Sequence, residues 1–215
     1  MGSKVAADQG RTQAGKVRMS RAERREQLIA VGRKLFAERG FAAASIEEIA
    51  LRAEVSKPVI YEHFGGKEGL YAVVVDQETH ELLGRISSAL SDGHPRLRLE
   101  QAALALLTYV EERTDGFRIL VRDSPVATTA GTFSGLLNDI ASQVEHILVR
   151  EFHERGYPRA MARMYSQSLV GMVALTAQWW LDERVPGKED VAAHLVNLSW
   201  NGLGHLENTP RLRLT

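Results

Sequence analysis

The chain of 215 residues contains no cysteine and only 6 prolines, and these scarcities exclude several kinds of protein. Without cysteine there is no disulfide framework and no zinc site built on thiolates. No apolar run approaches the roughly 18 residues that indicate a membrane span. The N-terminal residues are polar and lack the apolar centre of a secretory signal. We therefore expect a cytoplasmic protein that has no membrane partner.

The formal net charge is zero, which at first argues against a nucleic-acid partner. The charges are unevenly divided, however. Residues 1–71 hold 13 Lys and Arg against 9 Asp and Glu, whereas residues 72–215 hold 14 against 18. Only the surface that meets phosphate needs to be basic. A net charge of +4 at one end and −4 over the remainder is therefore compatible with DNA binding at the N-terminal end.

Hydrophobic periodicity predicts about nine helices and no convincing strand, so the expected fold class is all-α. Gly and Pro clusters separate the helices. The predicted helices cover residues 20–39, 45–53, 56–64, 67–90, 96–113, 116–123, 130–155, 159–182 and 189–206. We divide the chain into a flexible basic arm at 1–19, a three-helix DNA-binding domain at 20–66 and a larger helical domain at 67–215. The arm is either a disordered tail or a segment that settles on DNA phosphates or in a minor groove.

Two short helices, 45–53 and 56–64, are joined by a tight turn and predict a helix-turn-helix. In this motif the second helix enters the DNA major groove while the first lies across the backbone. Serines mark the helix starts: Ser20 and Ser45 each begin a capping box, and Ser56 is predicted to cap the second short helix. Pro58 lies in the first turn of that helix, where its missing N–H costs nothing.

The second short helix carries side chains suited to reading base edges. Reading requires hydrogen-bond donors and an apolar contact for the thymine methyl group, which Lys57, Val59, Tyr61 and His63 supply. Ser45 and Lys67 lie at helix N-termini, where phosphates bind favourably. The alternatives are a core position for Tyr61, a cap on its own helix for His63 and a solvated helix start for Lys67.

The run IEEIALRAEVSKPVIYEHFGGKEGLY, with ERGFAAAS before it, resembles the DNA-binding domain of TetR-family transcriptional regulators. The resemblance covers residues 20–71 and implies that Ser45, Lys57, Val59, Tyr61, His63 and Lys67 meet operator DNA. Arg21 is an additional candidate phosphate contact, and Ser56 and Pro58 begin the recognition helix. Pro58 departs from the family pattern, in which a small residue is common there, and should stiffen the start of that helix.

The last two predicted helices indicate a homodimer. Both are apolar nearly all round, and packing within one subunit explains only one face of each. The resemblance implies a four-helix bundle across a two-fold axis. A dimer would also read a palindrome whose half-sites lie about one helical turn apart. The candidate interface residues are Val191, His194, Leu195, Leu198, Asn201 and Gly202.

The larger domain is expected to hold an apolar effector, because its candidate lining has few polar groups. The candidates are Leu106, Leu107, Val110, Phe117, Leu120, Val121, Phe133, Leu137, Ile140, Met172, Leu175 and Trp179, and for each of them plain core is the alternative. The C-terminal half also resembles family members that answer to long-chain acyl-CoA and control fatty-acid synthesis. On that resemblance Arg118, Arg122, Arg159 or Arg163 would meet the nucleotide phosphates, with surface ion pairing as the alternative.

An enzyme is the main rival class, and the motifs that would support it are missing. There is no G-x-S-x-G, P-loop, G-x-G-x-x-G or H-E-x-x-H pattern. His146 and His153 share a helix face but lie about 10 Å apart along the axis, too far to share a metal. We expect no catalytic residue, metal or cofactor. Two other rivals stay open: a repressor of an efflux or catabolic gene that answers to an unrelated hydrophobic molecule, and an effector-free architectural protein with a solid second domain.

Overall fold

The computed structural model describes residues 19–122, 133–207 and 210–212. Within these residues the chain forms nine α-helices and a short 3-10 helix, and no strand, which confirms the predicted all-α class. Most of the basic arm, and the predicted start of the seventh helix at residue 130, lie outside the described residues. The helices are α1 (Arg21–Ala43), α2 (Ile46–Arg52), α3 (Lys57–Phe64), α4 (Lys67–Ser91), α5 (Pro95–Glu112), α6 (Thr114–Val121), α7 (Phe133–Arg155), η2 (Arg159–Met161), α8 (Ala162–Glu183) and α9 (Lys188–Gly204).

Short-range hydrogen bonds set the start of α1 as the sequence predicts. The Ser20 hydroxyl accepts from the N–H of Glu23 at 3.2 Å, and the Glu23 carboxylate accepts from the N–H of Ser20 at 2.7 Å. The straight part of the helix ends at Gly40, whose φ of 76° an L side chain rarely adopts.

The second predicted capping box, at the start of α2, is one-sided. The Ser45 hydroxyl accepts from the N–H of Glu48 at 3.2 Å. The Glu48 carboxylate, however, accepts from Arg52 at 2.9 Å and pairs with Arg39 at 3.2 Å. Two guanidinium groups therefore hold the carboxylate that the predicted box required.

The recognition helix α3 begins after a tight turn and ends just as sharply. Ser56 has the extended backbone of an N-cap, but its hydroxyl makes no capping hydrogen bond, contrary to the prediction. Pro58 lies in the first turn. Gly65 ends the helix in the left-handed conformation with φ 74°, and its N–H donates to the Tyr61 carbonyl at 2.8 Å.

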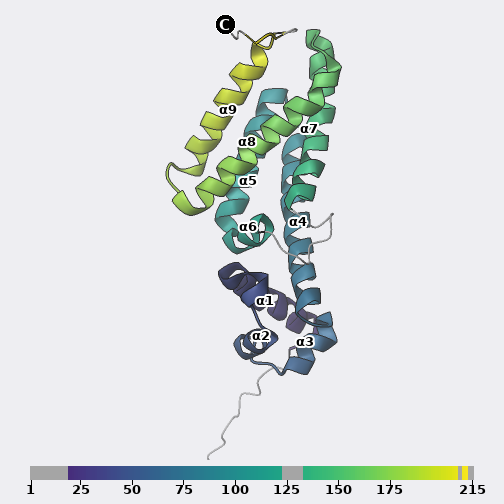
Figure 1. Ribbon diagram of the computed structural model, residues 1–215, viewed down its shortest axis with the longest axis vertical. Coiled ribbons are helices and arrows are strands. Elements are labelled where there is room, and N and C mark those ends of the chain that lie inside the picture. The colour runs from purple at the N-terminus through teal and green to yellow at the C-terminus, as the bar shows by residue number, and fades with distance from the viewer. Residues whose placement is uncertain (1–18, 123–132, 208–209, 213–215) are drawn as a thin grey trace, which may run out of the picture.

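A single hydrophobic core runs through both predicted domains. Ile49, Ile60 and Leu70 are buried at the α1–α3 end, and they belong to the same packed cluster as Leu107 and Phe117 beyond α4. Figure 1 shows why: α4, with 25 residues, rises from α3 into the larger domain, and α6 lies close to α1. The predicted domain boundary after residue 66 therefore divides the sequence into two parts, but one hydrophobic core continues across it.

The larger domain is a layered helical bundle. Helix α7 packs on α8, while α5 packs on α4 and α9. Figure 1 shows α7, α8 and α9 at the end of the molecule that lies farthest from α3. No helix in the described part of the chain carries an apolar stretch long enough to cross a membrane.

Candidate nucleic-acid interface and effector cavity

Helix α3 is anchored on one side and exposed on the other. Ile60 is fully buried in the core cluster, and α3 packs on α2 and α4, whereas Lys57 and Pro58 are exposed and Tyr61 is 55% exposed. Val59 and His63 are only half-buried rather than exposed, and Val59 packs against the core cluster. This corrects the expectation that all four candidate reading side chains stand clear of the protein.

Lys57 does not stand alone on this surface. Its ammonium group donates to the Glu47 carboxylate of α2 at 2.5 Å, and this hydrogen bond lowers the pKa of Glu47. Both side chains are more than half exposed, so the pair contributes little to stability. Arg21 and Glu62 form a similar exposed pair at 3.9 Å. The predicted DNA contacts of Lys57 and Arg21 stay predictions. In the structure, each of these side chains pairs with a glutamate, and that ion pair would have to open or share the cation when a phosphate binds.

Lys67 ties the α1–α2 connection to α4. Its ammonium group donates to the carbonyl oxygens of Phe41 and Ala44, both at 3.0 Å, and lies 4.4 Å from the centre of the Phe41 ring. An ammonium group has three donors. One donor is therefore left for the predicted phosphate contact, which stays a prediction, and the Lys67 side chain is held by carbonyl groups of the protein rather than merely solvated.

Glu78 of α4 is fully buried and is the centre of a charged cluster, which we call the Glu78 hub (Arg33, Glu78, Tyr109 and Arg113). Arg113 donates to both carboxylate oxygens, at 2.9 and 2.6 Å, and the Tyr109 hydroxyl donates at 2.8 Å. Arg33 Nε lies 2.6 Å from Oε1 as an ion pair rather than an aligned hydrogen bond. Burial alone would raise the pKa of the Glu78 carboxyl, but Arg113, Tyr109 and Arg33 outweigh it, so the pKa is lowered.

The Glu78 hub joins the DNA-binding helices to the larger domain. Arg33 comes from α1 and Tyr109 from α5, while Arg113 follows α5 directly. Gly116 of α6 lies against the hub so closely that an added Cβ would be 2.1 Å from a Glu78 oxygen. Arg122, just after α6, adds a second link by donating to the Ala37 carbonyl of α1 at 2.7 Å. Sequence reasoning missed this hub, although an acidic residue one turn after Val74 and one turn before Leu82 on an apolar stripe is a usable signal.

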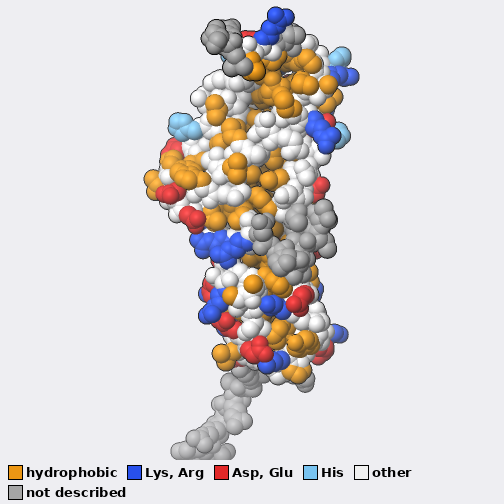
Figure 2. Space-filling view, viewed as in Figure 1, with side chains coloured by type: hydrophobic (Ala, Val, Ile, Leu, Met, Phe, Trp, Pro, Cys, Tyr) orange, Lys and Arg blue, Asp and Glu red, His pale blue; other side chains and the backbone are white. Residues whose placement is uncertain are grey.

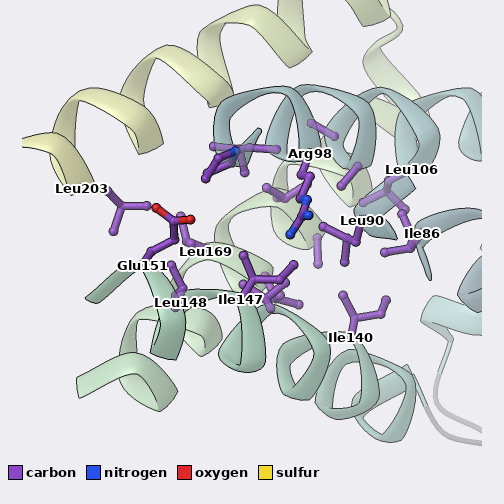
Figure 3. Close-up of a pocket in the computed structure, with 18 of the residues that line it drawn as sticks. Ile86, Leu90, Arg98, Leu106, Ile140, Ile147, Leu148, Glu151, Leu169 and Leu203 are labelled. Atoms are coloured by element: carbon purple, nitrogen blue, oxygen red, sulfur yellow. The ribbon is translucent and has the colours of Figure 1, made fainter. Parts of the chain in front are cut away.

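An apolar cavity of about 130 Å³ lies between α4, α5, α7, α8 and α9. This volume is similar to that of an engineered apolar cavity that holds benzene. Figure 3 shows side chains from α4, α5 and α7 converging on it. Of the predicted lining residues, Leu106, Phe133, Leu137 and Ile140 do line the cavity.

The other predicted lining residues lie elsewhere. Near α6, Leu107, Val110, Phe117 and Leu120 are buried core, and Val121 and Met172 pack partly buried against it. Leu175 is 66% and Trp179 49% exposed. The reason is the orientation of α8, which turns Leu169, Val170, Val173 and Ala174 towards the cavity.

Several of the residues that line the cavity were not predicted from the sequence, and these come from α4, α7 and α9. Ile86 and Leu90 come from the second half of α4, Ile147 and Leu148 from α7, and Leu203 from α9. Their apolar stripes were recognised in the sequence, but a stripe does not distinguish a cavity wall from solid core. The missed lining also contains charged side chains, namely Arg98, Glu151 and Arg155.

The candidate dimer residues on α9 divide between two faces. Val191 and Leu195 are buried within the chain, which packs α9 on α5 and corrects their assignment to an interface. Leu198 is 64% exposed, and His194, Asn201 and Gly202 are exposed beside it. Figure 2 shows hydrophobic side chains spread over the larger domain, while charged side chains of both signs gather around the α1–α3 end.

An exposed recognition helix on a three-helix unit, fused by one long helix to a helical domain with an internal cavity, defines a DNA-binding transcriptional regulator. Residues 28–74 match the family model of bacterial regulatory proteins of the tetR family, and residues 95–202 match the tetracyclin repressor-like C-terminal domain. The chain belongs to the tetR family and is a transcriptional regulator rather than an enzyme.

Similar proteins agree with this assignment over most of the chain. The HTH-type transcriptional activator FasR of Mycolicibacterium smegmatis is 32% identical over 196 residues, 89% of this chain and 88% of the relative. The HTH-type transcriptional repressor DhaR of Mycobacterium sp. strain GP1 is 30% identical over 138 residues, 63% of each protein. A crystal structure of a TetR-like regulator from Rhodococcus sp. RHA1 has the same fold, with a TM-score of 0.70, 24% identity and coverage of 87% of this chain and 99% of that one.

Proposed function

We propose that this regulator binds a palindromic operator as a homodimer, in the cytoplasm, and that an apolar effector in the cavity changes its affinity for DNA. The apolar lining supports a lipid chain as the effector class, with long-chain acyl-CoA as one candidate, and a whole chain requires the cavity to open beyond its present volume of about 130 Å³. The observation that carries this proposal is the cavity itself, whose lining is almost entirely apolar. Cavities of this kind bind apolar ligands through their walls and orient them through a few polar groups.

Contacts within the chain connect the cavity to the recognition helix. Helix α4 lines the cavity through Leu82, Ile86 and Leu90 and begins at Lys67, directly after the recognition helix. The Glu78 hub lies on α4 between these two ends and also holds α1. A ligand that tilts or shifts α4 therefore acts on both sides of the DNA-binding unit. The coupling equals the difference in ligand affinity between the two states, typically about 1–3 kcal/mol.

The homodimer is supported by apolar side chains that the chain itself leaves uncovered. Leu175 and Trp179 of α8 and Leu198 of α9 are each about half exposed or more. Gly202 of α9 has open space where a side chain would stand, so another helix can approach closely there. A two-fold axis through this face would cover the same residues on both copies. Analytical ultracentrifugation of Leu198→Glu beside the exposed control Asp190→Asn would test the face, and an unchanged dimer in Leu198→Glu would contradict it.

Operator affinity measured with and without effector tests the regulatory function. DNA fragments bound by the purified protein would first be selected, and the affinity for the best fragment would then be measured by fluorescence anisotropy with increasing dodecanoyl-CoA or hexadecanoyl-CoA. A change of about 5- to 150-fold is expected. Unchanged operator affinity at saturating ligand, with ligand binding shown separately, would sink the proposal for that ligand class.

Two alternatives have distinct outcomes in the same experiments. An effector from an efflux or catabolic substrate class would change operator affinity while lipid chains do not. An effector-free architectural protein would bind DNA and ignore every apolar ligand. The cavity disfavours the second alternative, because a solid domain needs no such space. Mass spectrometry of ligands that co-purify with the protein would separate the effector classes.

A further inference from the structure

The effector cavity has a charged side chain in a place where an apolar ligand alone would not need one. Arg98 of α5 lines the cavity, and its Nε is buried without a hydrogen-bond partner. Among the described residues, Arg98 forms no ion pair with a carboxylate. A buried guanidinium nitrogen without a partner is costly, because the desolvation is not compensated. Something that enters the cavity is expected to supply the missing acceptor.

The other two charged side chains of the cavity differ from Arg98 in having partners. Arg155 lies 4.0 Å from the carboxylate of Glu151, and its guanidinium stacks over the Trp200 ring at 5.7 Å. Among the described residues that line the cavity, Arg98 is therefore the cation that is left for a ligand.

Figure 3 shows how these charges divide the cavity. The Arg98 side chain extends from α5 into the middle of the space, towards α7. Glu151 lies to one side of it, near Leu203, and Ile86, Leu106 and Ile140 lie on the other side. On α7, Ile140 and Glu151 are separated by roughly 16 Å along the helix axis. The cavity thus has one end with the Glu151–Arg155 ion pair, a cation in the middle and an apolar end.

We propose that Arg98 is the anchor for the carboxylate of a free fatty acid whose chain lies along the apolar end towards Ile140. An arginine fork matches the two oxygens of a carboxylate, and the hydrogen bonds are charge-assisted. A head group that carried a nucleotide would be far larger than a carboxylate and would need space that a cavity of about 130 Å³ does not offer. This inference rests on the proposed function in one respect, namely that the cavity is the effector site.

Ligands that share a chain and differ only in the head group test the assignment. Dodecanoate, dodecanol and dodecanoyl-CoA would be titrated into the full-length protein at neutral pH by calorimetry. Wild type is expected to bind the acid roughly ten- to hundred-fold more tightly than the alcohol, which is the range for a hydrogen bond to a charged group. Equal affinity for acid and alcohol would overturn the proposal without any variant.

Variants of two arginines on the same helix complete the test. Arg98→Met keeps much of the volume and removes the charge, so acid affinity should fall to the level of the alcohol while alcohol affinity is unchanged. Arg98→Lys should keep part of the preference. Arg96→Met is the matched control, because Arg96 is exposed and pairs with Glu100 at 2.9 Å. Undiminished acid binding by Arg98→Met, or binding of acyl-CoA but not acid through Arg98, would overturn the carboxylate assignment.

The outcomes also distinguish this inference from the proposed function. If acid and alcohol bind equally and both change operator affinity, the cavity is an effector site and only the role of Arg98 fails. If neither the acid nor the alcohol binds, the proposed lipid effector and the proposed role of Arg98 fail together. If the acid alone binds and changes operator affinity, both stand.

Discussion

Two charged side chains of this regulator have opposite environments. Glu78 is fully buried and has three cationic or hydroxyl partners within 2.9 Å, whereas Arg98 is half-buried and its buried Nε has no partner among the described residues. The first lies between the DNA-binding helices and the larger domain, and the second lies in the cavity. A satisfied charge holds a structure together, while an unsatisfied charge costs stability until a ligand arrives. The difference separates the joint between the two parts of the molecule from its proposed effector site.

Removing the charge of Glu78 should have the largest effect. Glu78→Gln leaves Arg33 and Arg113 facing a neutral amide, and breaking a buried ion pair costs about 3–5 kcal/mol. Because both arginines are partly exposed, we expect about 2–4 kcal/mol less free energy of unfolding. Urea denaturation followed by circular dichroism measures it. Glu81→Gln, in an exposed pair with Arg85, is the control and should cost under about 1 kcal/mol; equal losses would show that burial of Glu78 does not matter.

Crowding the same hub without touching a charge should have the next largest effect. In Gly116→Ala the new Cβ would lie 2.1 Å from a Glu78 oxygen, so the carboxylate must move away from its partners. Overpacking of this kind costs about 1–3 kcal/mol. Gly84→Ala on α4 has open space at the Cβ position and should be neutral or stabilising by up to about 1 kcal/mol. Thermal melting of the two variants compares them, and a stable Gly116→Ala protein would mean that the hub rearranges freely.

The stabilisation by Glu78 should depend on pH in a defined direction. Its pKa in the folded chain is below the ordinary value of 4.5, so the folded state binds this proton less readily than the unfolded state. The stabilisation is therefore present in full above 4.5 and is lost as the pH falls through the lowered folded pKa. The difference in unfolding free energy between wild type and Glu78→Gln should shrink in that acid window. A difference that stays constant into strong acid would argue against an ionised Glu78.

The smallest effect on stability is expected for a substitution of Arg98. The direction of the change in unfolding free energy distinguishes Arg98 from Glu78. Replacing a buried charge by an apolar side chain of similar size is often neutral or stabilising. Ligand-free Arg98→Met should therefore unfold within about 1 kcal/mol of wild type, or at a higher urea concentration. Arg96→Met provides the baseline for an exposed arginine on the same helix. A loss as large as that of Glu78→Gln would show that Arg98 already has an internal partner.

Much of the fold could be predicted because its signals are local. The Ser20 cap depends on residues three apart, and the left-handed turn at Gly65 depends on one residue. The helix-turn-helix likewise lies within one short run of sequence. What failed depends on how helices are turned about their axes. Leu175 and Trp179 belong to the same apolar helix as Val173 and Ala174, and only packing against α7 decides which pair lines the cavity.

The roles of the buried Glu78 and the half-buried Arg98 were missed for a related reason. Glu78 and Arg113 are separated by 35 residues, and no local sequence pattern predicts that their side chains are in contact. Arg98 lies among leucines in the sequence and looks like one of the many surface arginines of a helical protein. The missing hydrogen-bond partner of its Nε can be recognised only from the three-dimensional structure, in which the other helices form the walls of the cavity.

The length of α4 turns a small motion into a large one. With 25 residues the helix is about 37 Å long. If it pivots near Ile86 by about 5°, its start at Lys67, roughly 28 Å away, moves by about 2.5 Å, which approaches the 3.4 Å between neighbouring bases along a DNA strand. In a two-fold dimer both recognition helices would move, and the distance between them would change by up to about 5 Å, or about one and a half base steps. A ligand the size of a fatty acid would then act as a gauge of half-site spacing.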